Sequence, residues 1–510
     1  MHPRGALLSR DLLALLHHQI VRWAILFTAA FFLLFANANQ TRIYGDAIRY
    51  SGEARAMADS GEYATLRFGQ EPNHHGPLLF WLSAFAIKIF GATPFAATVF
   101  SRLFGVGCVV MTAWLGSYLF GEEIGWISAL ALATNYTFFR NTTTLRMDSG
   151  LTFGVLLALA GYLRGERRWG PPLFYGGIAV AVLAKSIPGF LPLFLAPFHA
   201  ILARQFYLPW RKQSVRWLRW SPLLLVPLAW WGYLSMHYGT EVFSRILSDF
   251  EETNHADVSR LYEFFEIYVF GFGMSYILWL PFALVGIRMA WRGAFDSKTE
   301  TGKRAVLGLL LGWVGIVFLS GGLKPGEYER YLMPALPAIS IMSGMAVVRI
   351  LRDRIPAWLP GAVAALTVAA AIGMTCLPVS AQFGEGQRML AMEEILNRRL
   401  VPHSPVPIIR AGIRARKYPQ GSWADQGRCR FFFGRDSRPM TIAEAQEAAA
   451  RGRFTAIVRK ADYPVVADQL KLAPLIETSF WILAEVGSGS DIALASQRAS
   501  IKDSSETASE

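Results

Sequence analysis

Long apolar stretches, separated by short polar ones, occupy most of the first three quarters of the chain. The clearest cover residues 23–36, 223–236, 268–285, 306–319 and 357–377. A helix needs about 20 predominantly apolar residues to cross the hydrocarbon core of a bilayer, and these stretches approach that length. The pattern therefore predicts a polytopic α-helical membrane protein with about eleven transmembrane helices.

The loops between these stretches alternate in charge. Arg4, Arg10 and Arg22 precede the first apolar stretch, and later basic loops occupy residues 164–168 and 204–220. Short basic loops stay in the cytoplasm, so we expect a cytoplasmic N-terminus. Residues 38 to about 93 and the acidic loop that follows residue 236 then lie outside.

One apolar segment is too short to cross the bilayer comfortably. Residues 78–90 carry the aromatic side chains of Phe80, Trp81, Phe85 and Phe90. Aromatic residues concentrate at the level of the lipid headgroups. We therefore predict an interfacial helix here, in the first outer loop.

The character of the chain changes near residue 380, where apolar content falls. Residues 454–460 read as a strand, and residues 441–452 read as a helix with Thr441 and Glu444 as its capping box. We predict three parts: a transmembrane domain at 1–379, a small outer α/β domain at 380–486, and a disordered Ser-rich tail at 487–510.

Composition supports the membrane assignment. The 510 residues are 53% hydrophobic and 17% charged, whereas about a quarter of a soluble domain is charged. A net charge of +13 would suit a nucleic-acid partner in a soluble protein. Here the excess basic residues lie in the loops that we place in the cytoplasm, so no nucleic-acid partner is expected.

A set of polar residues falls at the outer ends of the predicted helices. Each could be a solvated loop residue, but carboxylates at two helix ends and basic groups at three others would meet on one face of the bundle. Ionisable groups near spans usually face a cavity or a partner. The set comprises Asp46, His74, His75, Arg146, Asp148, Lys185, Lys324, Glu327, Tyr328, Glu329, Arg330 and Tyr331.

Six motifs in this region carry a family resemblance. They are, in order, YGDAIRY, EPNHHGPLLFWL, FSRLFGVG, LRMDSGLTF, LAKSIPGFLP and KPGEYERYLMPALP, within residues 25–348. Together they resemble the GT-C glycosyltransferases, in particular the bacterial relatives of protein O-mannosyltransferases and of the lipid A aminoarabinose transferase. The resemblance implies a GT-C-like helical fold and a sugar donor linked to polyprenyl phosphate.

The resemblance also departs from the family pattern at three places. Asp46 is followed by Ala47 where the family often has Asp-Glu. Gly76-Pro77 replaces Pro-Pro, with His75 at the Lys/His position. Ser186 follows Lys185 where the family has glycine.

The residue types fit sugar transfer chemically. Asp46 is the candidate general base for the acceptor, because partial burial would raise its basicity; a helix N-cap is the alternative reading. Asp148 matches the second carboxylate motif and is the second candidate catalytic residue, with a role in positioning the substrate or the cations. Lys185, Lys324 and Arg330, beside Tyr331, are candidates to bind the leaving phosphate; Lys185 could instead be a lysine that snorkels to the interface.

Three further residues complete the candidate set. Arg102 could pair with Asp46 or Asp148, or contact phosphate. His74 and His75 are adjacent, so both cannot face one site from a regular element, which argues against a two-histidine metal pair. His75 is the better candidate to contact phosphate or sugar. No cofactor is indicated, and a divalent metal stays open.

These observations favour an inverting membrane glycosyltransferase acting at the outer face of the bacterial inner membrane, with active site and C-terminal domain in the periplasm. The acceptor could be lipid A, a cell-surface glycan or a protein. The alternatives are a flippase or transporter of a lipid-linked saccharide, an oligosaccharide polymerase or ligase, and a membrane-anchored binding module. A transporter site would sit near the bilayer centre, whereas the ionisable residues here lie at the outer edge.

Overall fold

A computed structural model gives the structure of the chain. It describes residues 19–36, 38, 43, 45–64, 67–68, 71–72, 76–165, 167–203, 216–239, 271–322, 329–351, 385–411 and 423–487. The described chain forms two compact units. The first spans 1–38, 64–82 and 98–377, and the second spans 39–63, 83–97 and 378–510.

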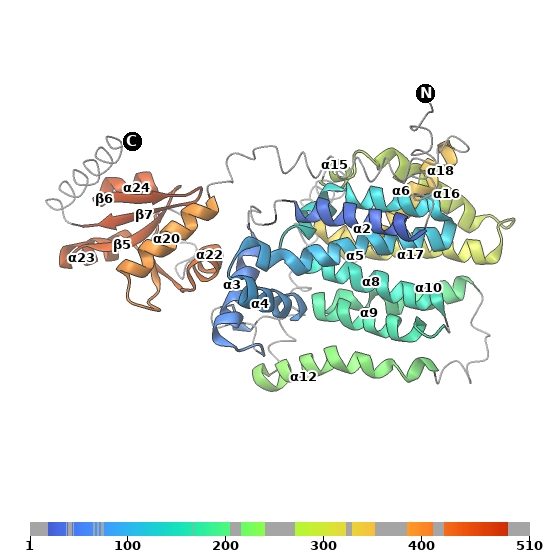
Figure 1. Ribbon diagram of the computed structural model, residues 1–510, viewed down its shortest axis with the longest axis horizontal. Coiled ribbons are helices and arrows are strands. Elements are labelled where there is room, and N and C mark those ends of the chain that lie inside the picture. Colours follow the sequence, from blue (N-terminus) through green and yellow to red (C-terminus); the bar gives the residue numbers. More distant parts are fainter. Residues whose placement is uncertain are drawn as a thin grey trace, which may run out of the picture. The chain divides into compact units, whose positions relative to one another are not determined.

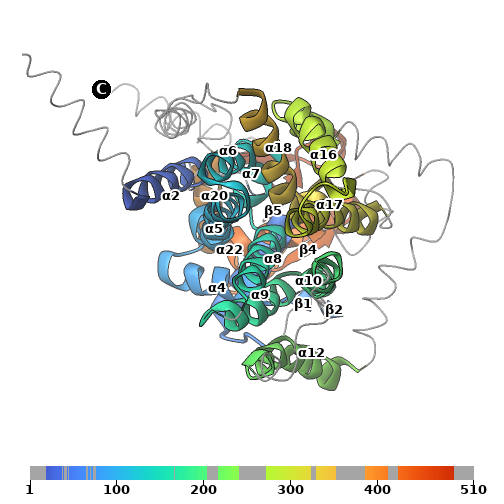
Figure 2. The same cartoon turned by 90° about the vertical axis from the view of Figure 1, so that its right-hand side faces the viewer.

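The first unit is a bundle of helices. In Figure 2, which looks along the bundle, α8 lies beside α9 and α10, while α16, α17 and α18 form a neighbouring group. The principal helices are α2 (Gln19–Phe35), α5 (Pro94–Phe120), α6 (Glu122–Ala133), α7 (Tyr136–Thr142), α8 (Met147–Arg164), α9 (Gly170–Lys185), α10 (Leu191–Leu202), α12 (Leu225–Tyr238), α16 (Leu280–Phe295), α17 (Thr301–Gly322) and α18 (Leu336–Leu351).

The apolar helices match the predicted membrane character. Within the described residues, three are long and apolar enough to cross a bilayer: Pro94–Phe120, Thr301–Ser320 and Arg330–Leu351. The last joins a 3₁₀ segment, η6 (Glu329–Ala335), to α18. The chain is an integral membrane protein. The predicted total of about eleven spans stays a prediction, because the apolar stretch 357–377 lies outside the described residues.

The apolar stretch at residues 124–139 does not form one continuous helix. Helix α6 ends at Ala133 and α7 begins at Tyr136. Asn135 causes the break, because its side chain accepts a hydrogen bond from the backbone N–H of Phe138 at 2.8 Å and caps the new helix. The apolar pattern continues across this break, which is why hydrophobicity alone could not reveal it.

The first predicted outer loop holds two helices. These are α3 (Asp46–Ser60) and α4 (Leu78–Phe90), with the short strands β1 (Arg67–Phe68) and β2 (Glu71–Pro72) between them. The bounds of α4 are those predicted from the aromatic-rich segment. Its place at a membrane interface stays a prediction.

The C-terminal part of the second unit contains a five-stranded mixed sheet (Figure 1). The strand order is β4-β3-β5-β7-β6, in which β3 pairs parallel with β4 and β5, while β7 pairs antiparallel with β5 and β6. The strands are β3 (Val406–Ile409), β4 (Ser437–Met440), β5 (Phe454–Arg459), β6 (Leu472–Glu477) and β7 (Trp481–Val486). The predicted strand at 454–460 is β5.

Helices cover both faces of this sheet. On one face, α20 (Glu385–Arg399) and α22 (Trp423–Phe433) pack against a core that includes Ile457. On the other, α23 (Ile442–Arg451) and α24 (Tyr463–Gln469) pack around Ala456 and Val458. Successive residues of β5 thus face opposite layers, as a strand requires. The predicted capping box of Thr441 and Glu444 is confirmed at the start of α23.

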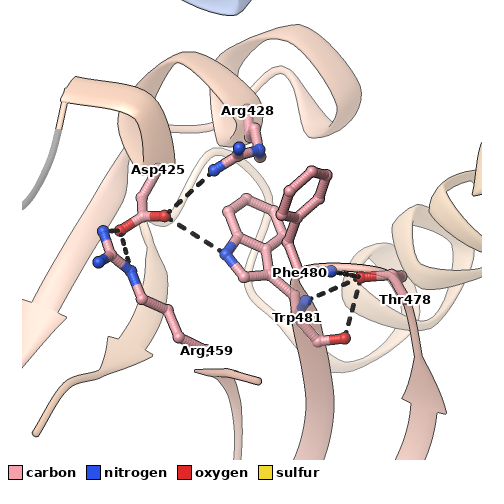
Figure 3. A network of polar contacts seen from close by, with 6 residues as sticks. All are labelled: Asp425, Arg428, Arg459, Thr478, Phe480 and Trp481. Carbon is pink, nitrogen blue, oxygen red and sulfur yellow. Dashed lines mark hydrogen bonds and ion pairs between the residues drawn. The ribbon is translucent and has the colours of Figure 1, made fainter. Parts of the chain in front are cut away.

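A buried carboxylate joins α22 to the sheet (Figure 3). Asp425, 2% exposed, accepts hydrogen bonds from Arg459 Nε at 2.8 Å and from Trp481 Nε1 at 3.3 Å. Arg428 Nη1 lies 3.6 Å from the same carboxylate. Arg459 ends β5 and Trp481 begins β7, so Asp425 anchors the first turn of α22 to two neighbouring strands.

Candidate active site

The site in the helical unit depends on how closely α8 and α9 pack. A Cβ added to Gly154 would lie 2.6 Å from the backbone nitrogen of Ala181, and one added to Gly177 would lie 2.4 Å from that of Ala158. Backbones that approach this closely need small residues, a pattern typical of helix pairs in membranes. The two helices run antiparallel, so the start of α8 meets the end of α9.

This meeting point holds a buried ion pair. Asp148 is the second residue of α8 and 3% exposed, and Lys185 is the last residue of α9. Lys185 Nζ donates a hydrogen bond to Asp148 Oδ1. A carboxylate at a helix N-terminus and a cation at a helix C-terminus both complement the helix dipole. The structure thus brings together two residues predicted from separate motifs.

Tyr331 and Arg330 adjoin the pair. Lys185 Nζ lies 4.5 Å from the centre of the Tyr331 ring, and the Arg330 guanidinium carbon lies 5.3 Å from the same centre. Both distances suit cation–π contact. The short 3₁₀ segment η6 positions these two residues before α18 begins.

The charges around Asp148 are mostly positive. Lys185, Arg330 and Arg146 each act on its carboxylate electrostatically. Arg146, which is 9% exposed, immediately precedes α8. It belongs to the polar residues at the outer helix ends, and the sequence predicted no role for it. Its position two residues before Asp148 was the available signal. Three cations and one carboxylate form a cluster that suits an anionic ligand such as a phosphate.

Backbone strain marks the residue after Lys185. Ser186 has φ 53° and ψ −128°, a conformation that favours glycine. The chain then turns back into a 3₁₀ segment, η2 (Ile187–Phe190), that packs on α9. This strain accounts for the glycine that the family has at this position, and the serine here keeps the same corner.

The departure at Gly76 also has a structural reason. A Cβ added to Gly76 would lie 2.1 Å from the carbonyl oxygen of Leu183. The return of the first loop therefore presses its backbone against the last turn of α9, two residues before Lys185. Only glycine leaves room for this contact.

Arg102 lies deep in the bundle. It is fully buried and donates hydrogen bonds to Thr98 Oγ1 at 3.0 Å, to the carbonyl of Thr143 at 2.8 Å and to the carbonyl of Leu34. These contacts join α2 and α5 to the segment that leads into α8. These hydrogen bonds favour a structural role for Arg102. Its contact with phosphate or with a carboxylate stays a prediction.

Asp46 belongs to the other compact unit. It is the half-buried first residue of α3, and the N-cap is Gly45, with φ 58° and ψ −141°. Asp46 is therefore not the N-cap, as the alternative interpretation predicted, but the residue that follows it. Its position in the first turn of α3 still lets its carboxylate complement the helix dipole.

Five of the predicted polar residues lie outside the described part of the chain. They are His74, His75, Lys324, Glu327 and Tyr328. Within the part of the chain that the structure describes, no three His, Cys, Asp or Glu side chains gather in a way that would hold a metal ion.

Comparison with known proteins shows which families and structures this chain is similar to. The sequence model of the family described as dolichyl-phosphate-mannose-protein mannosyltransferase matches residues 74–233, which include Asp148 and Lys185. The predicted family resemblance is confirmed. The match begins just before α4 and ends within α12.

Two curated proteins are similar over longer stretches. A protein of Aquifex aeolicus, described as uncharacterized, is 25% identical over 304 residues, which are 58% of this chain and 57% of that protein. Undecaprenyl phosphate-alpha-4-amino-4-deoxy-L-arabinose arabinosyl transferase 1 of Pseudomonas fluorescens is 24% identical over 351 residues, 66% of this chain and 59% of that protein. The chain thus matches somewhat under two thirds of each relative's length.

Solved structures share the fold over a larger part of the chain. ArnT from Cupriavidus metallidurans bound to undecaprenyl phosphate superposes with a TM-score of 0.67 at 15% identity, covering 91% of this chain and 98% of that one. The apo structure of the same protein gives 0.63 at 16% identity, covering 91% and 97%. The mostly helical architecture and the C-terminal sheet thus form an ArnT-like fold.

Proposed function

We propose that this chain is an inverting membrane glycosyltransferase that moves a sugar from a polyprenyl-phosphate donor to an acceptor at the outer face of the membrane. The observation that carries the proposal is the buried Asp148–Lys185 pair with Arg330 and Tyr331 beside it. A similar fold, that of ArnT, has been solved bound to undecaprenyl phosphate. The confirmed family resemblance supports the same donor class.

The cation cluster explains how the leaving group would be stabilised. When the acceptor oxygen attacks the anomeric carbon, the bond to the phosphate oxygen breaks and negative charge grows on the phosphate. Lys185, Arg330 and Arg146 could stabilise that charge. Asp148 keeps Lys185 in place through their hydrogen bond. Because the cations are already in position, little reorganisation is needed during the reaction.

Asp46 completes the proposal as the general base. It would accept the proton of the attacking hydroxyl, or orient an attacking amine. This role rests on the motif resemblance and on the half-buried position of Asp46 at the start of α3. Replacing Asp46 with Asn is expected to reduce transfer roughly a hundredfold. Full activity in Asp46→Asn would remove it as the base.

A binding experiment tests the donor site without knowledge of the sugar. Undecaprenyl phosphate is added to the purified protein in nanodiscs, and the shift in thermal stability is measured. Undecaprenol, which lacks the phosphate, is the matched ligand control. Losing one hydrogen bond to a charged group weakens binding about ten- to a hundredfold, and we expect this for Arg330→Met. Arg292→Met, an exposed arginine of α16, should leave the affinity unchanged.

A transfer experiment tests the reaction class. Labelled undecaprenyl-phosphate aminoarabinose is supplied in liposomes with lipid A as acceptor, and free undecaprenyl phosphate is measured. Release that requires the acceptor and falls in Arg330→Met supports a transferase. Movement of intact donor between leaflets without release would refute the proposal and favour a flippase.

A further inference from the structure

Helix α3 begins and ends with glycines in conformations that other residues rarely adopt. Gly45 precedes it with φ 58°, and Gly61 follows it with φ 72°. At both ends the chain turns sharply, so the axis of α3 is not set by a continuing helix. Packing must therefore fix the axis. The residues of α3 buried by that packing include Ile48, Gly52 and Met57.

The partner of α3 is α22 of the C-terminal domain, and the two helices cross at a pair of glycines. A Cβ added to Gly52 would lie 2.8 Å from the carbonyl oxygen of Gly427. One added to Gly427 would lie 2.9 Å from the Cα of Arg49 and 3.0 Å from the carbonyl oxygen of Ile48. The backbones are thus in direct contact, and any side chain at either glycine would force them apart.

Polar contacts flank this crossing. Arg430 Nη1 lies 3.0 Å from Glu53 Oε1, and Arg430 Nε donates to Asp436 Oδ1 at 2.7 Å. Arg55 Nη1 donates to the carbonyl of Phe431 at 2.6 Å. Glu53 is 5% exposed, and burial raises its pKa to about 7. These contacts fix the rotation of α3 about its own axis, which the glycine contact alone would leave free.

Helix α22, against which α3 packs, is itself held by the sheet. Asp425 lies two residues before Gly427 and binds Arg459 of β5 and Trp481 of β7 (Figure 3). Because α22 is joined to the sheet in this way, it cannot shift without disturbing the core of the C-terminal domain. The position of α3 is thus determined by a sheet whose strands lie far along the sequence, between Val406 and Val486.

We propose that the C-terminal α/β domain is a positioning element for Asp46. Gly427 and Arg430 are the positioning residues that act through α3. Asp46 is three residues before Arg49, whose backbone contacts Gly427, so it lies about 4.5 Å from that contact along the helix axis. A tilt of α3 would therefore displace its carboxylate. The inference rests on the proposed function only in taking Asp46 as the general base.

The test is a set of variants in the full-length protein in nanodiscs, assayed by release of undecaprenyl phosphate. Gly427→Val should lower kcat about a hundredfold, because misplacing a reacting group by about 1 Å can cost that much. KM for the donor should stay within about twofold of wild type, since the proposed phosphate site does not include α3 or α22. Ala450→Val, at an exposed position of α23, is the matched control and should change neither constant.

A second variant pair covers the case in which Gly427→Val does not fold. Arg430→Met should lower kcat about tenfold, and Arg430→Lys, which keeps the charge beside Glu53, should recover part of it. Hydrogen exchange should rise across residues 46–60 in Arg430→Met and stay unchanged in α8 and α9. A rise in exchange with normal kcat would overturn the inference and leave the contact purely structural.

The outcomes also separate this inference from the proposed function. A wild-type protein that neither binds undecaprenyl phosphate in nanodiscs nor releases it from the donor would refute the proposed function. An active wild type with active Gly427→Val and Arg430→Met variants would refute only the positioning role. If these variants lose kcat while Asp46→Asn keeps it, the link to Asp46 is wrong.

Discussion

Two buried carboxylate–cation pairs, one in each compact unit, are closely matched in exposure. The side chain of Asp148 is 4% exposed and that of its partner Lys185 is 18% exposed. The side chain of Glu53 is 6% exposed and that of its partner Arg430 is also 18% exposed. Burial alone would therefore give the two pairs the same behaviour. The charges around them differ.

Asp148 lies among three cations, and Tyr331 contacts two of them, Lys185 and Arg330. Glu53 has Arg430 and Arg49 nearby, but Asp436 opposes them and shares Arg430. One cluster has spare positive charge for an anionic ligand. The other is nearly balanced, which suits a contact between two helices. Neighbouring charges rather than burial thus distinguish the proposed binding site from the contact between two helices.

Removing the cation should affect the two pairs differently, and this is the largest expected effect. Lys185→Met removes the hydrogen-bonded cation of the buried Asp148 carboxylate. Breaking a buried pair in this way typically costs about 3–5 kcal/mol of unfolding free energy. Arg430→Met should cost less, about 1–3 kcal/mol, because Glu53 can take up a proton near neutral pH. Denaturant or thermal unfolding in the same detergent measures both.

A double variant sharpens this result. Asp148→Asn combined with Lys185→Met should recover much of the stability, because both members of the buried pair are then removed together. Donor binding and transfer should stay low, since the cation is still missing. Recovery of activity together with stability would show that the pair serves folding alone.

The stability of the protein should also depend on pH through the Glu53–Arg430 pair. The pKa of Glu53 is raised from 4.5 to about 7 in the folded state, so folded protein binds more protons than unfolded protein between these values. Its contribution therefore stabilises most at low pH and falls as pH rises towards 7, by at most about 1.4 kcal/mol per pH unit. Glu53→Gln should remove this slope. An unchanged slope would mean that another group titrates.

Neighbouring glycines on α9 offer a matched test of close packing. Gly177→Ala should cost about 1–3 kcal/mol, because its Cβ would meet the backbone nitrogen of Ala158 at 2.4 Å. At Gly176 the nearest atom to an added Cβ is 4.0 Å away, on Leu223. Gly176→Ala should thus be neutral or slightly stabilising. Equal effects at the two positions would contradict the packing of α8 on α9.

The smallest expected effect concerns the corner after Lys185. Ser186→Gly should raise stability by about 1 kcal/mol, because glycine adopts the observed φ of 53° without strain. Ser186→Ala keeps the Cβ and should bring no such gain. Donor affinity is expected to stay the same in Ser186→Gly, which a titration with undecaprenyl phosphate would check.

Local patterns in the sequence predicted much of this structure. The bounds of α4, the strand β5 and the capping box of Thr441 and Glu444 depend on residues within one or two turns of each other, and the structure confirms all three. The candidates Asp148 and Lys185 came from motifs, but their direct pairing depends on helix packing. Motif order gave no distance between them.

Contacts between distant segments were beyond the sequence pattern. Gly52 and Gly427 each look like an ordinary helix glycine, and only the folded chain shows that they meet. Asn135 breaks a helix inside a run that is apolar on both sides. Ser186 gives no sign of its conformation from residue type, since serine rarely adopts it. These features arise from tertiary packing, which overrides local preference.

The two outer strands of the C-terminal sheet share one feature. Each carries a proline, Pro439 in β4 and Pro474 in β6, and the register of β6 shifts just after its proline. Proline has no backbone N–H to offer a further strand, and a bulge twists the edge away from a regular ladder. Both borders of the sheet therefore resist adding a strand from another molecule, which should keep this domain from assembling edge to edge at high concentration.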